Sequence, residues 1–327
     1  MIFTPRLVAG QLMNNHVLPY PLSLDCLFQQ SDHSCVQKLT MLNLPEKAVF
    51  LDVDGTIVGQ QHLDSIDEGT LQKFGQLCSS LRSLNWAIGL NSDTPLCYLE
   101  RVAQRMGLVN DTPIIAEHGA VFSFAGLEIH LHSMTDAAEW KTAIREIARS
   151  SGFHEEIPDG VFSLVYGGTQ PKDLIASSKW GFGANRHHSV SVFAPSVLIE
   201  DITKRLDHTV LNSRNLYVHS NPKECFLAIH KQSVPGMSAE ANKAKALALI
   251  ERAILAQGRS PNIVMIGDGP ADFVDNALFG TSIWSIMVPG GRGVPEDVGK
   301  RVHFTPQKRL LEGVIEGVEF ILRGASR

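Results

Sequence analysis

Short apolar runs that end in polar turns recur along the chain. The first is AVFLDV, residues 48–53, which has the uninterrupted hydrophobicity of a buried strand and ends in the turn DGT. Residues 65–84 then place apolar side chains at helical spacing, and WAIGL, residues 86–90, repeats the buried-strand pattern. This succession predicts a strand, helix, strand unit.

The same alternation continues further along the chain. Pro95 opens a second predicted helix, which runs to Met106, and PIIAEHGAVF, residues 113–122, supplies a third strand and a turn at Gly119. Strands that alternate with helices in this way form parallel sheets covered on both faces. We therefore expect an α/β fold with a mostly parallel sheet.

The pattern changes between residues 127 and 220. A helix-like segment, DAAEWKTAIREIAR, precedes two strand candidates, VFSLVY and SVSVF, and a helix from Pro195 to Leu206. These elements predict a smaller α+β domain inserted into the first one.

From residue 221 the alternation resumes. A helix is expected over 239–256, then the strands NIVMIGD and SIWSIMV, and a closing amphipathic helix over 307–322. We assign residues 45–126 and 221–327 to the main domain and 127–220 to the insertion. Residues 1–44 are weakly periodic and predict an extension whose role the sequence does not reveal.

Composition narrows the possible partners. With 327 residues, 44% of them hydrophobic, the chain can bury a large core. Its net charge of -5, with Lys and Arg dispersed, gives no basic stripe, so we expect no nucleic-acid partner. Five cysteines without a CxxC pair fit a reducing compartment, and neither a signal peptide nor a membrane span is evident. We expect a cytoplasmic protein with no membrane partner; its oligomeric state is left open.

Two carboxylates follow the first strand in the segment FLDVDGTIV. Asp52 and Asp54 stand two residues apart, in a turn that Gly55 makes tight and Thr56 can hydrogen-bond. Carboxylates that converge at the end of a strand make a hard, oxygen-rich site of the kind that Mg²⁺ prefers together with phosphate oxygens. An aspartate beside such a cation stays ionised and can attack phosphorus.

DxDGT after an apolar strand resembles the first motif of the haloacid dehalogenase superfamily. That resemblance implies a Rossmann-like core with an inserted cap domain, and Mg²⁺ as the cofactor. It implies that Asp52 forms an aspartyl-phosphate, and that Asp54 acts as acid and base on the leaving group and then on the attacking water. We expect both residues at the metal site.

A second motif is expected where the second strand ends, in GLNSDTP. The superfamily places here a Ser or Thr that hydrogen-bonds the transferring phosphoryl group, and Ser92 fits that role. Asn91 can occupy the same place, so we retain it as a substrate contact. Ser92 can instead cap the helix that begins near Pro95.

The third and fourth motifs follow the insertion. Lys243, in ANKAKALALI, matches the lysine that neutralises the phosphoryl charge, although Lys245 and Lys231 lie close by. IVMIGDGPAD resembles GDxxxD, which implies that Asp268 binds Mg²⁺ and that Asp272 binds or supports it.

The position of the insertion, between the second and third motifs, resembles the branch that includes trehalose-6-phosphate, sucrose-phosphate and mannosyl-phosphoglycerate phosphatases. AEHGAVF also resembles a segment of that branch, which implies that Glu117 and His118 face the substrate. In the cap, substrate choice is expected to involve polar residues of KWGFGANRHH. These are Lys179, Arg186, His187 and His188.

Together these patterns predict a Mg²⁺-dependent phosphatase that acts on a small phosphorylated metabolite, and we expect a sugar phosphate. Two alternatives remain. A phosphomutase would use the same aspartyl-phosphate and return the phosphoryl group to a sugar. A binding or regulatory protein would keep the fold without turnover.

Overall fold

The computed structural model describes most of the chain in nine stretches. These are residues 30–59, 63–108, 111–131, 137–157, 178–209, 216–231, 241–290, 299 and 301–325. Within them, no helix has the length and apolar character needed to cross a membrane. The strand candidate VFSLVY, residues 161–166, lies outside the described residues.

A seven-stranded sheet forms the centre of the main domain, in the order β11-β10-β1-β2-β3-β4-β5. The first five strands in this order run parallel, whereas β4 and β5 are antiparallel to their neighbours. The strands are β1 (Lys47–Leu51), β2 (Trp86–Asn91), β3 (Ile114–Ala116), β4 (Val121–Phe124), β5 (Leu127–His130), β10 (Asn262–Gly267) and β11 (Trp284–Met287).

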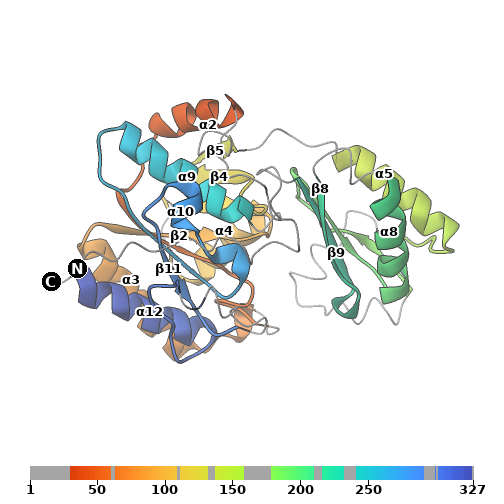
Figure 1. The fold of residues 1–327 in the computed structure, drawn as a ribbon. Coiled ribbons are helices and arrows are strands. Elements are labelled where there is room, and N and C mark those ends of the chain that lie inside the picture. The colour runs from red at the N-terminus through yellow and green to blue at the C-terminus, as the bar shows by residue number, and fades with distance from the viewer. Residues whose placement is uncertain are drawn as a thin grey trace.

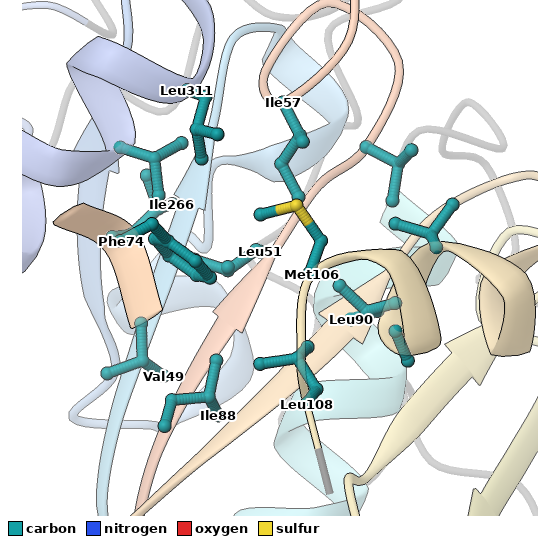
Figure 2. Packing of buried hydrophobic residues seen from close by; sticks show 14 of the residues in the cluster. Val49, Leu51, Ile57, Phe74, Ile88, Leu90, Met106, Leu108, Ile266 and Leu311 are labelled. Atoms are coloured by element: carbon teal, nitrogen blue, oxygen red, sulfur yellow. The ribbon is translucent and has the colours of Figure 1, made fainter. Parts of the chain in front are cut away.

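Helices cover both faces of this sheet (Figure 1). Because successive side chains of a strand point to opposite faces, Val49 and Leu51 of β1 belong to one apolar cluster, and Ala48 and Phe50 belong to another. Figure 2 shows the first cluster, in which Phe74 packs near Leu51 and Ile266. On that face lie α3 (Glu68–Ser83), α4 (Leu96–Arg105) and α12 (Leu310–Ala325), and on the other α2 (Gln30–Thr40), α9 (Ala241–Ala256) and α10 (Asn276–Phe279). The expected fold class is confirmed.

A second, four-stranded antiparallel sheet forms the cap domain, in the order β6-β7-β9-β8. Helices α5 (Ala137–Ser150) and α8 (Ser196–Thr209) pack on the face that points away from the main domain (Figure 1). The strands are β6 (Gly181–Phe182), β7 (Ser189–Phe193), β8 (Leu216–Asn221) and β9 (Phe226–Lys231). Three short 3₁₀ turns complete the described elements: η1 (Leu63–Ser65), η2 (Pro222–Glu224) and η3 (Pro270–Asp272).

The domain boundaries differ from those expected. Strand β5 begins at Leu127, at the start of the expected insertion, yet it pairs with β4 in the main sheet. Strand β9 lies beyond residue 221, yet it pairs with β7 and β8 in the cap. PIIAEHGAVF forms two antiparallel strands, β3 and β4, instead of one. Local hydrophobicity marks a strand but does not identify the strand with which it pairs, and this explains each difference.

The described part of the N-terminal extension packs on the main domain. Asp32 of α2 forms a buried ion pair with Lys245 of α9, with 2.9 Å between Oδ2 and Nζ. Gln257 Nε2 also donates to the carbonyls of Thr40 and Leu42, each at 2.8 Å. Residues 30–44 are therefore part of the folded core.

Candidate active site

Parallel pairing brings the candidate residues to one edge of the sheet. Leu51 is in register with Leu90 of β2 and with Ile266 of β10. Asp52, Asn91 and Asp268 therefore leave their strands at neighbouring positions, because the carboxyl ends of parallel strands meet at the same edge.

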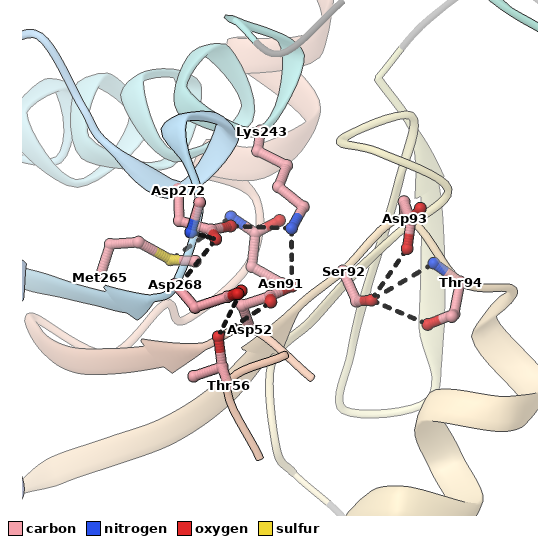
Figure 3. Close-up of polar contacts among 11 residues, drawn as sticks. Asp52, Thr56, Asn91, Ser92, Asp93, Thr94, Lys243, Met265, Asp268 and Asp272 are labelled. Atoms are coloured by element: carbon pink, nitrogen blue, oxygen red, sulfur yellow. Dashed lines mark hydrogen bonds and ion pairs between the residues drawn. The ribbon is translucent and has the colours of Figure 1, made fainter. Parts of the chain in front are cut away.

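Three buried carboxylates meet there, and a lysine joins them (Figure 3). One oxygen each of Asp52, Asp268 and Asp272 lies within 4.8 Å of the others. Lys243 Nζ, from the first turn of α9, lies 2.6 Å from Asp52 Oδ1 and 2.8 Å from Asp272 Oδ1. The structure thus joins residues from the first, third and fourth motifs.

The turn after β1 orients these carboxylates. Thr56 is fully buried, and its Oγ1 lies 3.0 Å from Asp52 Oδ2 and 3.2 Å from Asp268 Oδ1, so its hydroxyl can donate to either. Gly55 has a φ of +92°, and a Cβ at this position would overlap the Asp268 carboxylate. The glycine therefore permits the close approach of the turn to Asp268.

Asp272 is fixed by the backbone of its own turn. Its Oδ2 accepts hydrogen bonds from the N–H groups of Asp268 and Gly269, each at 3.2 Å. Its other oxygen contacts Lys243.

The electrostatics of the cluster favour a divalent cation. Burial and the neighbouring Asp272 raise the pKa of Asp52 well above its usual range, against the opposing effect of Lys243. Burial disfavours the charge on Lys243, but Asp272 and Asp52 more than offset this and raise the pKa of the lysine. Three carboxylates facing one ammonium leave two negative charges when all are ionised. An oxygen-only donor set with that charge fits Mg²⁺.

Asn91 and Ser92 differ in what they contact. Asn91 is fully buried, lies next to Asp52 across the sheet, and places its Nδ2 3.7 Å from Met265 Sδ. Ser92 is also buried, but its Oγ contacts its own turn, at 3.0 Å from Thr94 Oγ1 and 3.4 Å from Thr94 N (Figure 3). Both residues stay within the site, and the choice between them for the phosphoryl contact stays a prediction.

Two other candidates are exposed. Asp54 lies at the surface of the turn after β1 and outside the group of three carboxylates. Lys179 is exposed in the loop before β6. A direct metal contact from the Asp54 side chain and a substrate contact from Lys179 stay predictions.

Cap residues reach the same edge of the sheet. Arg186 Nη1 donates to the carbonyl of Asp93 at 2.6 Å, and Glu117 accepts hydrogen bonds from the backbone N–H groups of His187 and His188. His188 Nε2 lies 2.7 Å from Nδ1 of His130. Most of the predicted cap candidates therefore lie against the main domain.

Sequence reasoning missed two residues of this region, Asp93 and His230. Burial opposes ionisation of Asp93, but Arg186 and Lys243 outweigh it, so the pKa of this carboxyl falls below its usual range. His230, from β9, has its ring 4.8 Å from that of His118, and burial together with the charge of His118 lowers its pKa well below 6.5. The position of Asp93 directly after Ser92 was a signal in the sequence. His230 reaches this region only because β9 pairs with the cap strands, which the sequence did not indicate.

The sequence matches no protein-family model and no curated protein. The fold is that of the haloacid dehalogenase-like hydrolases. A haloacid dehalogenase-like hydrolase from Bacteroides thetaiotaomicron superposes with a TM-score of 0.58 and 15% identity, over 84% of this chain and 99% of that one. A haloacid dehalogenase-like hydrolase from B. subtilis superposes with a TM-score of 0.52 and 14% identity, over 84% of this chain and 99% of that one. A sucrose-phosphatase from Synechocystis sp. superposes with a TM-score of 0.48 and 14% identity, over 85% of this chain and 98% of that one.

Proposed function

We propose that this protein is a Mg²⁺-dependent phosphomonoester hydrolase that acts on a small phosphorylated metabolite through an aspartyl-phosphate on Asp52. One observation carries the proposal: Asp52 is buried with Asp268 and Asp272, and Lys243 Nζ lies 2.6 Å from its Oδ1. An Asp52 oxygen that lies beside both a fixed cation and a metal-type donor set supports the role of nucleophile.

Asp52, Asp268 and Asp272 would hold the metal ion. When bound, Mg²⁺ supplies positive charge at the phosphoryl oxygens. An oxygen of Asp52 then forms a bond to phosphorus as the bond to the leaving oxygen breaks, and Asp54 gives its proton to that oxygen. In the second step Asp54 takes a proton from water, whose oxygen displaces the Asp52 carboxylate and releases phosphate.

The remaining residues hold the phosphoryl group in place. Lys243 offsets its negative charge and orients Asp52, and Asn91 or Ser92 donates a hydrogen bond to one of its oxygens. The exposure of Asp54 is in keeping with a group that must reach a leaving oxygen on the substrate side of the turn. Gly55 and Thr56 shape the turn around the phosphoryl site.

We further propose that the substrate is a sugar phosphate and that the protein acts in the cytoplasm. The first proposal is supported by Arg186 and His188, polar residues of the cap that lie against the main domain near the phosphoryl site. The second is in keeping with the free thiols of Cys35, Cys78, Cys97 and Cys225.

A panel of sugar phosphates, assayed for phosphate release with Mg²⁺ or with EDTA, tests the proposal. We expect release that requires the metal and that falls at least about a thousandfold in Asp52→Asn. Asp111→Asn is the matched control, because Asp111 is an exposed aspartate that precedes β3, at the opposite edge of the sheet. Undiminished release by Asp52→Asn would refute the assignment of the nucleophile. Conversion to an isomeric sugar phosphate without release would favour a phosphomutase.

A further inference from the structure

One contact between the cap and the main domain is made by a short segment, residues 186–189, which we call the docking segment. Glu117 is its partner. Oε1 of Glu117 accepts the backbone N–H of His187 at 2.7 Å, and Oε2 accepts those of His188 and Ser189 at 2.8 and 3.1 Å. Ser189 Oγ adds a fourth hydrogen bond, at 3.0 Å from Oε2. Three successive backbone N–H groups thus bind one carboxylate, which is an anion-binding arrangement.

Glu117 is buried, with an exposed fraction of 3%, and its backbone is tied to the phosphoryl site. It follows β3 in the left-handed region, with a φ of +48°. Its N–H donates to the carbonyl of Thr94 at 3.0 Å, and the N–H of His118 donates to that of Ser92 at 3.1 Å. The carboxylate that holds the cap is therefore fixed to the turn that follows β2.

Arg186, from the docking segment, forms a further contact between the cap and the turn after β2. It is 6% exposed, and its Nη1 donates to the carbonyl of Asp93 at 2.6 Å and to Ser189 Oγ at 3.1 Å. Asp93 directly follows Ser92, so Arg186 stands one residue from the expected phosphoryl contact. An arginine guanidinium carries five N–H donors, which suit a polar group of a leaving alcohol.

From this geometry we infer that Glu117 is a positioning residue, which docks the cap over the phosphoryl site and thereby sets Arg186 against the leaving group. The placing of Arg186 against the leaving group rests on the proposed function, whereas the docking of the cap by Glu117 does not. Glu117 acts through the docking segment. Its loss should therefore weaken the binding of a large leaving group more than it slows the attack on phosphorus. A substrate with a small leaving group, such as acetyl phosphate, should depend on it least.

Backbone amide hydrogen exchange of the full-length chain tests the docking. In Glu117→Ala we expect the amides of His187, His188 and Ser189 to exchange at least about tenfold faster, because their acceptor is gone. Glu117→Gln keeps one acceptor oxygen and should give a smaller increase. Unchanged exchange at these amides in both variants would overturn the inference.

Glu251→Gln is the matched control for exchange. Glu251 is 2% exposed and likewise accepts hydrogen bonds from a backbone N–H and a serine hydroxyl, both of Ser282. It joins two segments of the main domain, so its substitution should leave exchange at the docking segment unchanged. Slow exchange retained at residues 190–193 of β7 and in β9 of each variant shows that the cap is still folded.

Steady-state kinetics test the positioning role. We expect Glu117→Gln to lower kcat/KM for a hexose phosphate about tenfold more than for acetyl phosphate. An equal loss with both substrates would contradict the role of Glu117 in placing Arg186. A wild-type chain that releases no phosphate from either would refute the proposed function, and hydrogen exchange would then still decide whether Glu117 docks the cap.

Discussion

Lys243 links the packing of the site to its proposed chemistry. It is 5% exposed and contacts Asp52 and Asp272 at the same time. Without it, burial and mutual repulsion act on the carboxylates unopposed by a fixed positive charge. In the proposed mechanism, the same ammonium group offsets the charge of the phosphoryl group.

We expect Lys243→Met to lower the free energy of unfolding in EDTA by about 3–5 kcal/mol, because it leaves buried carboxylates unpaired. Added Mg²⁺ should recover part of this loss and should stabilise the variant more than the wild type. Chemical denaturation with and without Mg²⁺ measures both effects. Lys73→Met is the control: Lys73 forms an exposed ion pair with Glu319, so its loss should change stability by less than about 1 kcal/mol. Equal stability of the two variants in EDTA would contradict the role given to Lys243.

At the scale of elements, the site depends on how closely the turn after β3 approaches α9. Gly119 has a φ of +87°, and a Cβ there would overlap the carbonyl of Asn242 and lie 3.2 Å from the backbone nitrogen of Lys243. The turn that carries Glu117 and His118 therefore packs directly on the first turn of the helix that carries Lys243. Only glycine permits this contact without moving the helix.

Gly119→Ala should therefore lower the free energy of unfolding by about 2–3 kcal/mol and reduce phosphate release. Gly126→Ala separates the two contributions, because Gly126 has a φ of +76° but open space where a Cβ would lie. We expect that control to lose only about 1 kcal/mol and to keep its activity. Matching losses of stability and activity in the two variants would show that the contact with α9 is unimportant.

The elements themselves could be predicted from the sequence, but their partners could not. The period of hydrophobic residues predicted β1, β2, β10 and α9 within a few residues, because each has one environment along its length. Which sheet β5 or β9 joins depends instead on the strand with which each forms hydrogen bonds. The motifs predicted one site for Asp52, Lys243 and Asp268, and these side chains do lie together. The contacts of Glu117 with the cap were not predicted, because they too depend on which distant segments pack together.

At the scale of the molecule, helix α2 is joined to α9, the helix that carries Lys243. Asp32 and Lys245 are 2% exposed each and pair at 2.9 Å. Lys245 stands two residues after Lys243, so α9 presents one lysine to the site and the other to α2. Residues 30–40 thereby help to fix the position of α9.

We expect Asp32→Leu to destabilise the chain by about 3–5 kcal/mol, because Lys245 keeps a buried charge without this carboxylate. The double variant Asp32→Leu, Lys245→Met should recover most of the loss, since apolar pairs often replace buried ion pairs at little cost. Denaturation of both single variants and the double variant measures the coupling. Additive losses in the double variant would mean that the two residues do not act as a pair.

The most direct measurement is mass spectrometry of the chain quenched in acid during turnover of a sugar phosphate with Mg²⁺. If Asp52 is the nucleophile, one phosphoryl group should be found on the peptide that contains Asp52, and it should be absent from Asp52→Asn. Turnover with no phosphoryl group on the chain, or with the group on another residue, would contradict the proposed mechanism.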